Sequence, residues 1–165
     1  MRRAYKNKKG MTLMEVLVGS MLFGMVVVTV SAIISPMIMS YRRANDLAEY
    51  NMILDNVGNL LVSEMSQASD VLITGTGVEL SFQSGAPKVI FNVVDGSLIK
   101  TFDTVTPQST PAFPPGFYRG KSVEFEVTGV EPNFTILVTV RADGTTGPSS
   151  AAMQRAYAVR PLQLS

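Results

Sequence analysis

The feature that most constrains this chain is a long uncharged segment close to its amino terminus. About 24 residues from Val16 to Met39 carry no charged side chain and are mostly apolar, and a single carboxylate, Glu15, precedes them. A run of 18 or more apolar residues is long enough to span a membrane as one helix. Because a charge at the edge of such a span is energetically costly, Glu15 is a candidate functional residue.

Basic side chains are concentrated before this apolar run. Five of the fourteen Lys and Arg residues precede Gly10 in the sequence: Arg2, Arg3, Lys6, Lys8 and Lys9. Cytoplasmic flanks of membrane helices are enriched in Lys and Arg. We therefore expect the amino terminus inside the cell and the carboxyl terminus outside, although Arg42 and Arg43 weakly oppose this orientation.

The junction between the basic and apolar segments reads Lys8-Lys9-Gly10-Met11-Thr12-Leu13-Met14-Glu15. It resembles the processing site of type IV prepilins, in which a short basic leader ends in Gly and a Glu lies five residues after the cut. The family usually begins the mature chain with Phe, and Met11 departs from that pattern. The resemblance implies cleavage between Gly10 and Met11 by a prepilin peptidase, N-methylation of Met11, and a role for Glu15 in assembly with other pilin subunits.

Two other interpretations of the amino terminus stay open, a cleaved secretory signal and a simple signal anchor. The apolar run is longer than the roughly 7–15 residues of a secretory signal, and no small-x-small cleavage site is found around Ala32. A simple anchor would explain the length of the run, but it would explain neither Glu15 nor the Gly10 junction.

The prepilin resemblance divides the chain into a leader (1–10), a helix in the membrane or filament core (11–40) and an extracytoplasmic globular domain (41–165). It implies a single-pass protein of the cytoplasmic membrane that later enters a cell-surface or periplasmic filament. Loss of the leader would leave nine of the fourteen basic residues against thirteen acidic ones, so the mature chain would be mildly acidic.

The composition argues against several classes of function. The chain contains neither His nor Cys, which excludes Ser-His-Asp and Cys-His catalysis, imidazole metal sites and disulfides. Asp95-Gly96 and Asp143-Gly144 are explained by turns rather than by a calcium loop, which needs clustered oxygen ligands. We expect no enzyme activity, no cofactor and no metal. A net charge of +1 and scattered basic residues leave nucleic acid as a partner without support.

The helical pattern continues beyond the apolar run to about Ser69. Apolar residues recur at spacings of three and four, as on one face of a helix. The predicted face consists of Leu47, Tyr50, Ile53, Leu54, Val57, Leu60, Leu61 and Met65. A helix from Met11 to Ser69 would be roughly 85–90 Å long, so we expect one half in lipid or a partner and the other half against the globular domain. This resembles the helical spine of the pilin fold.

Helix-breaking residues interrupt the apolar half at Gly19, Gly24 and Pro36. Membrane helices tolerate such residues, and this tolerance is enough to explain the presence of Gly19. In pilins, part of the spine can unwind when a subunit enters the filament, and Gly24 fits the start of such a stretch. Pro36 lies a few residues later than the usual proline. Gly58 is expected to let the helix approach the sheet closely.

The remainder of the chain alternates with the period of two that is typical of strands. Asp95-Gly96 predicts a type I′ hairpin turn, and Arg155 interrupts an apolar face, which indicates an edge strand. The predicted strands are 78–83, 88–94 and 97–102, which form a meander, followed by 122–128, 133–141 and 153–159.

A proline-rich segment from Thr104 to Gly120 separates the two groups of strands, and we expect no regular strand or helix within it. It is either a crossover between parts of the sheet or a contact surface for a neighbour or ligand. Phe113, Phe117 and Tyr118 favour the contact surface, since exposed aromatic residues anchor interfaces.

Together these features predict an α+β protein with one long helix, whose distal half packs on an antiparallel sheet of five to seven strands. The resemblance implies a structural subunit, more like a minor pilin or pseudopilin than a major pilin, in a pilus, type II secretion or DNA-uptake system. Two alternatives are a pilus-tip adhesin or DNA receptor on the same anchor, and an anchored hydrolase, which the missing His and Cys disfavour.

Overall fold

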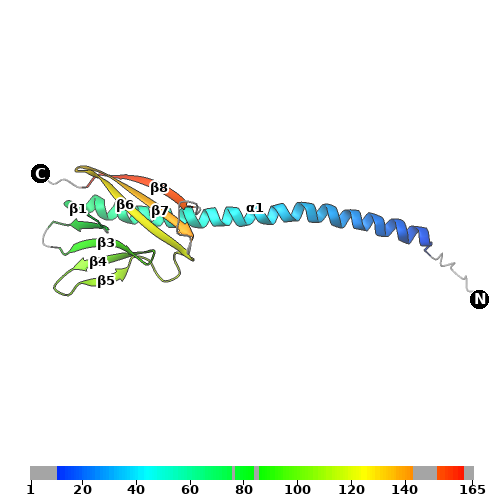
Figure 1. Cartoon of the computed structure of the whole chain (residues 1–165), viewed down its shortest axis with the longest axis horizontal. Helices are drawn as coiled ribbons and strands as arrows, with labels where there is room; N and C mark the ends of the chain where they lie inside the picture. Colours follow the sequence, from blue (N-terminus) through cyan, green and yellow to red (C-terminus); the bar gives the residue numbers. More distant parts are fainter. Residues whose placement is uncertain (1–10, 76, 84–85, 143–151, 162–165) are drawn as a thin grey trace, which may run out of the picture. The chain divides into compact units, whose positions relative to one another are not determined.

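The protein is described here by a computed structural model, covering residues 11–75, 77–83, 86–142 and 152–161 (Figure 1). One helix, α1 (Leu13–Gln67), is followed by strands only. In chain order they are β1 (Asp70–Thr74), β2 (Gly77–Ser81), β3 (Lys88–Val94), β4 (Ser97–Asp103), β5 (Gln108–Pro111), β6 (Lys121–Val130), β7 (Asn133–Ala142) and β8 (Ala152–Val159). The expected α+β class is confirmed.

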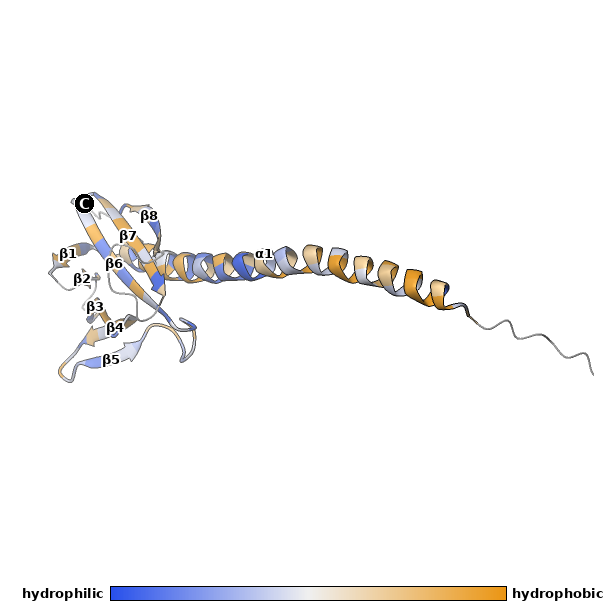
Figure 2. Ribbon diagram, turned by 45° about the vertical axis from the view of Figure 1, so that its right-hand side comes forward, coloured by the Kyte–Doolittle hydropathy of each residue, from blue (hydrophilic) through white to orange (hydrophobic). Residues whose placement is uncertain are grey.

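The chain forms two compact units, Met1–Asp46 and Leu47–Ser165. In the first unit the described residues are Met11, Thr12 and the amino-terminal part of α1. The side chains of this part of the helix are exposed, and most of its residues are hydrophobic (Figure 2). This helix is long and apolar enough to cross a membrane. It continues through Gly24 and Pro36 without a break. Unwinding on assembly remains a prediction.

In the second unit, the rest of α1 supplies one side of the hydrophobic core. Its buried residues are Ile53, Leu54, Val57, Gly58, Leu61 and Met65, at the spacing expected for one helix face. Tyr50 and Leu60 are partly buried at the border of this face. The prediction was wrong for Leu47, whose side chain is 51% exposed, because the helix makes its core contacts only from the following turns onward.

Two antiparallel sheets pack with the helix in this unit. The first has the order β1-β2-β3-β4-β5 and the second has the order β6-β7-β8. The meander of β2, β3 and β4 is confirmed, and so is the tight turn between β3 and β4, in which Asp95 and Gly96 have φ angles of 50° and 71°. The expectation of five to seven strands in one sheet was wrong, because the described residues form eight strands in two sheets.

The proline-rich segment contains a short strand, so the prediction that it holds no regular strand or helix was wrong. β5 pairs with β4 at the edge of the first sheet, with Pro111 opposite Ile99. The next residue, Ala112, donates a 2.9 Å backbone hydrogen bond to the carbonyl oxygen of Leu98. Because bonded and non-bonded positions alternate in an antiparallel ladder, the position of Pro111 needs no donor toward β4. An edge strand therefore tolerates this proline.

The core is formed by side chains from both sheets together with the helix face. Leu98, Val123 and Ile136 are completely or almost completely buried. The complete set of buried apolar sheet residues is Val71, Val78, Leu80, Val89, Phe91, Leu98, Val123, Val127, Phe134, Ile136, Val138, Val140 and Val159. Stability of this cysteine-free domain therefore depends on apolar burial and on the polar contacts described below.

Candidate functional site

The predicted assembly residue, Glu15, lies in the first turn of α1 and is held by Thr12. The backbone N–H of Thr12 donates to Glu15 Oε2 at 2.9 Å, and the Thr12 hydroxyl donates to the same oxygen at 3.1 Å. In return, the backbone N–H of Glu15 donates to Thr12 Oγ1 at 3.3 Å. This reciprocal arrangement is a capping box, which satisfies backbone donors that an isolated helix end leaves unpaired.

The capping box gives Glu15 a local structural role in addition to the predicted role in assembly. Its signal was present in the sequence, because Thr12 and Glu15 match the Ser/Thr-x-x-Glu pattern that marks helix starts. A carboxylate in the first turn is also favoured by the positive end of the helix dipole. Glu15 therefore has local partners before any contact with another chain.

The surface around Glu15 is otherwise apolar. Thr12, Met14, Glu15, Val18, Gly19 and Leu22 line a shallow groove of about 460 Å³. Met14 is 70% exposed and Leu22 is 59% exposed. An exposed apolar surface of this extent is typical of membrane or protein contacts. The residues predicted to form the leader and its cut, Lys8, Lys9 and Gly10, lie outside the described residues, and Met11 is exposed just before the helix.

In the second unit, acidic side chains of α1 bind basic side chains from the strands and from the segment before β6. Glu49 contacts Arg119 at 3.0 Å and Lys121 at 2.6 Å. Glu64 contacts Lys100 of β4 at 2.6 Å. These ion pairs join parts of the chain that are far apart in sequence, and they flank the apolar face of the helix.

Arg155 of β8 completes this set of helix contacts. Its guanidinium donates to Asp55 and, at 2.9 Å, to Asn51. The expected position of Arg155 on an edge strand is confirmed, since β8 pairs only with β7 in its sheet. These contacts explain why a charged residue interrupts the apolar face of β8. The Arg155 side chain extends to polar residues of α1 that lie beside the buried helix face.

Glu49 forms ion pairs with two basic side chains, Arg119 and Lys121. Hydrogen bonds from Lys121 and Arg119 lower the pKa of its carboxyl group from its ordinary value. Its side chain is 18% exposed, and Lys121 Nζ also lies 5.1 Å from the centre of the Tyr50 ring. This cluster therefore attaches both the start of β6, at Lys121, and the segment before it, at Arg119, to the helix.

The aromatic residues of the proline-rich segment form a packed cluster. Phe113 and Phe117 stack with their ring centres 4.1 Å apart, and Tyr118 packs edge-on against both. Tyr118 accepts a 2.9 Å hydrogen bond from the backbone N–H of Leu98, and burial raises the pKa of its hydroxyl. All three rings are partly buried against the core, so they are not the exposed aromatics that favoured a contact surface.

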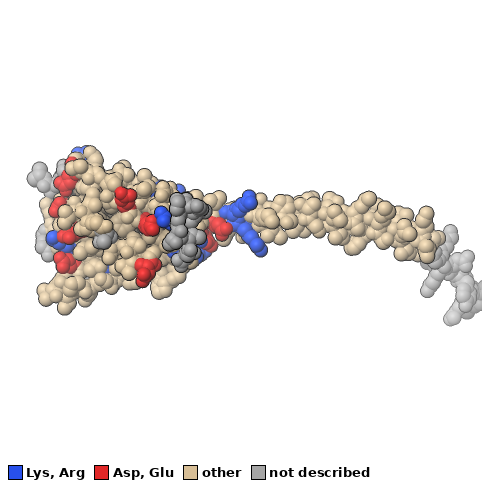
Figure 3. Space-filling view, in the orientation of Figure 1, with Lys and Arg blue, Asp and Glu red and all other residues tan. Residues whose placement is uncertain are grey.

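The basic side chains of the second unit do not form a separate stripe among the described residues. Lys88 pairs with Glu79 and Arg141 pairs with Glu124, in addition to the four bases bound to α1. Figure 3 shows acidic and basic groups mixed over the visible face. The described residues include no group of three or more acidic side chains placed to hold a metal ion. The Asp143-Gly144 turn lies outside the described residues.

Comparison of the chain with protein-family models, with curated protein sequences and with solved structures finds no match. The structural class of this protein is therefore described from its fold and its local geometry alone. It is an α+β protein with one amino-terminal helix capable of spanning a membrane, an acidic capping residue at the start of that helix, and an antiparallel β domain.

Proposed function

We propose that this protein is a structural subunit of a type IV pilus-like filament, made as a prepilin and processed between Gly10 and Met11. The observation that carries the proposal is the position of the helix start relative to the expected cut. Thr12 caps the helix and α1 begins at Leu13. Cleavage after Gly10 would therefore leave a mature chain that is helical almost from its first residue.

The distribution of apolar surface also supports a filament subunit. From Met11 to Met39 the apolar side chains are exposed in the isolated chain and need lipid or other subunits to cover them. A helix of this kind can lie in the membrane before assembly and against other helices afterwards. Glu15 would then be the acidic group that contacts the amino terminus of a neighbouring subunit, as the prepilin resemblance implies.

The place of the subunit in the filament follows from the resemblance alone. We propose a minor pilin or pseudopilin of a pilus, type II secretion or DNA-uptake system. The described residues give no specific support to a DNA receptor, because six of their basic side chains are bound to carboxylates. They also give no specific support to a hydrolase, because the chain has no His or Cys nucleophile system.

Co-expression of the full chain with a prepilin peptidase tests the proposal directly. We expect mass spectrometry to find a product that begins at N-methylated Met11. The Gly10→Val variant should stay uncut, because a branched side chain replaces a residue with none next to the scissile bond. A conservative Lys6→Arg change in the leader is a matched control and should be cut normally. An intact amino terminus in the unchanged chain, or a cut near Ala32, would contradict the proposal.

A further inference from the structure

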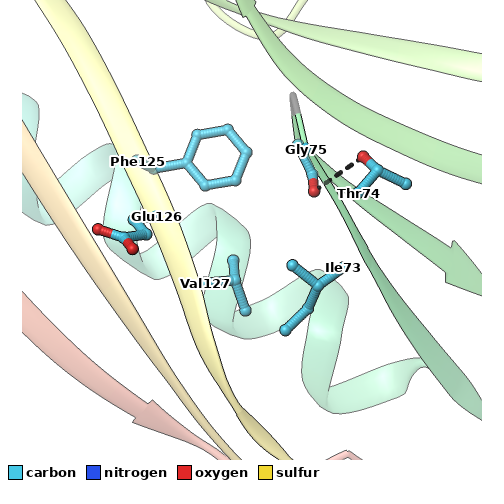
Figure 4. Close-up of a pocket in the computed structure, with 7 residues that line it drawn as sticks. Ile73, Thr74, Gly75, Phe125, Glu126 and Val127 are labelled. Atoms are coloured by element: carbon cyan, nitrogen blue, oxygen red, sulfur yellow. Dashed lines mark hydrogen bonds between the residues drawn. The ribbon is translucent and has the colours of Figure 1, made fainter.

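The outer face of the second sheet, which is directed away from the core, carries polar side chains of β6, β7 and β8. Successive residues of a strand point to opposite faces of its sheet. Val123 and Val127 of β6 are buried in the core, so Glu124 and Glu126 lie on the outer face. Figure 4 shows this alternation, because the side chain of Glu126 lies on the other side of β6 from those of Phe125 and Val127.

The strand register brings side chains from all three strands together on this face. Thr139 of β7 is paired with Glu124 of β6 on one side and with Gln154 of β8 on the other. Directly paired side chains have Cβ atoms about 4.5–5.5 Å apart. A shallow depression of about 390 Å³ is lined by Glu124, Glu126, Leu137, Thr139, Arg141 and Gln154, among others. Its volume is within the roughly 300–1,000 Å³ found for ligand pockets.

Thr139 lies at the floor of this depression. Its side chain is 6% exposed, and it is the only buried polar residue within the described ranges. Its hydroxyl group makes no hydrogen bond to any described residue. Buried polar groups in folded proteins nearly always have a hydrogen-bond partner. The floor of the depression therefore offers a hydroxyl group that a bound molecule would satisfy.

Two charged side chains beside Thr139 also have incomplete sets of partners. Arg141 pairs with Glu124 at 3.2 Å, but its buried Nε atom has no acceptor within the described ranges. The Arg141 side chain is 32% exposed, so a small rotation would present the Nε–H group to a ligand. Glu126 forms no ion pair and no hydrogen bond with any described residue. A donor, a hydroxyl group and an acceptor are thus left without partners in one place.

This combination favours an uncharged ligand with several hydroxyl groups. An anion would be repelled by Glu124 and Glu126, and a cation would be repelled by Arg141 and could not accept a hydrogen bond from it. A hydroxyl group both donates and accepts. Neighbouring hydroxyl groups of one ligand can therefore accept from Arg141 and donate to Glu126. Sugars carry hydroxyl groups in this arrangement, on adjacent carbon atoms.

The apolar part of the depression indicates which kind of sugar fits. Leu137 is paired with Glu126 of β6 and with Ala156 of β8. Gln154 lies two residues before Ala156 on the same face, and its amide both donates and accepts hydrogen bonds. An acetamido group combines an amide with a methyl group. Its amide would pair with Gln154, and its methyl group would lie over Leu137 and Ala156.

We propose that this depression on the outer face of the second sheet binds an uncharged sugar that carries an acetamido group. The Thr139 hydroxyl bonds to one sugar hydroxyl, Glu126 accepts a hydrogen bond from another, and Leu137 contacts the acetyl methyl group. The residues of this site take no part in processing at Gly10 or in capping at Glu15. The proposal can therefore be tested whether or not the chain is cut and enters a filament.

An NMR titration of the full chain tests the site, in micelles of a detergent without a sugar headgroup. The probe is the uncharged disaccharide N,N′-diacetylchitobiose, which carries two acetamido groups. It should shift the amide signals of Leu137, Thr139 and Gln154 in a saturable way and leave those of β3 unchanged. A blocked lysine amide, which offers a cation and no hydroxyl groups, should cause no saturable shift.

Variants of two lining residues, each with a matched control, locate the binding. Thr139→Val breaks no hydrogen bond to a described residue, so the protein should stay folded while binding weakens about tenfold. Thr135→Val changes the same residue type on the same face of β7, outside the depression, and should bind normally. Glu126→Ala should weaken binding about tenfold or more, because hydrogen bonds to charged groups are stronger. Glu131→Ala, in the exposed turn after β6, is its control. Unchanged signals of β3 report that each variant is folded.

Three outcomes would overturn the proposal. The first is the absence of saturable shifts when the disaccharide is added to the unchanged protein. The second is unchanged affinity in both Thr139→Val and Glu126→Ala, which would place any binding elsewhere. The third is saturable binding of the lysine amide at Leu137, Thr139 and Gln154, which would make the depression a site for a basic segment of a partner protein.

Discussion

The ring of Tyr157 on β8 fills the space beside Gly58 of α1 that any larger residue at that position would need. A Cβ atom at Gly58 would overlap the ring. The Tyr157 hydroxyl donates a 2.8 Å hydrogen bond to the carbonyl oxygen of Leu54, one turn earlier in the helix. The expectation that Gly58 allows close approach of helix and sheet is confirmed, and Tyr157 is the residue that makes the approach.

Gly58→Ala should therefore destabilise the protein, although Ala favours a helix interior over Gly by about 1 kcal/mol. Overpacking typically costs about 1–3 kcal/mol, and displacement of the ring would also break its bond to Leu54. Chemical denaturation of the second unit measures the change. In a Tyr157→Ala background the same Gly58→Ala change should become neutral or stabilising, and a destabilisation of equal size there would contradict the explanation.

Leu61→Asp should cost at least about 3 kcal/mol of unfolding free energy, because it places an unpaired charge in the core. Leu61 is completely buried. Leu47→Asp is the matched control on the same helix, and it should change stability by no more than about 0.5 kcal/mol, as is usual for exposed sites. Thermal melting of the two variants in the same detergent distinguishes them. Similar melting temperatures would mean that the buried face of α1 is assigned wrongly.

The Glu49 cluster should make stability depend on pH in the acidic range. Its ion pairs with Lys121 and Arg119 lower the pKa of Glu49 in the folded state. The stabilisation is therefore present above the unfolded-state pKa of about 4.3 and is lost as the pH falls through the lower folded-state pKa. Glu49→Gln should reduce stability at pH 7 and flatten its fall between neutral and acidic pH.

The control for this prediction is Glu131→Gln, which removes one negative charge from an exposed turn. It should leave the dependence of stability on pH close to that of the unchanged protein. Denaturation curves recorded from pH 7 down to pH 3 provide the comparison. Equal slopes for Glu49→Gln and the unchanged protein would show that the cluster does not contribute to the acidic loss of stability.

Glu15 should be required for assembly rather than for insertion or cleavage. Glu15→Ala removes both the capping box and the charge, whereas Glu15→Gln keeps a capping side chain and removes only the charge. If the carboxylate pairs with the amino terminus of a neighbouring subunit, both variants should be inserted and cut at Gly10 but enter filaments poorly. An unpaired charge in low-dielectric surroundings is costly, so loss of one member disfavours the contact.

The measurement compares cleaved subunit in the membrane with subunit in sheared filaments. If Glu15→Gln assembles normally and Glu15→Ala does not, the capping box rather than the charge is the requirement. Normal assembly of both variants would remove Glu15 from the mechanism and would favour a position at the filament tip, where one partner of such a pair is absent.

Local patterns in the sequence were enough to predict the helix, most strands and the β3–β4 turn. These patterns involve only residues that are close together in the sequence. They are the 3.6-residue period of α1, the alternation in β3 and the Asp95-Gly96 pair. The capping pattern of Thr12 and Glu15 is also local and is visible in the sequence. Only Glu15 was predicted to be functional, and its pairing with Thr12 was not predicted. Glu15 and its capping partner Thr12 are three residues apart, so both could be identified from the sequence alone.

The contacts between residues that are distant in the sequence could be known only from the tertiary structure. The pairing of Arg155 with Asp55 joins residues 100 positions apart, and no periodicity in either segment specifies that pairing. β5 was missed because its pairing with β4 overrides the proline signal at a sheet edge. The division into two sheets likewise depends on which strands pair with one another across long stretches of sequence. Local periodicity determines which face of an element is apolar, but only packing determines which other element covers it.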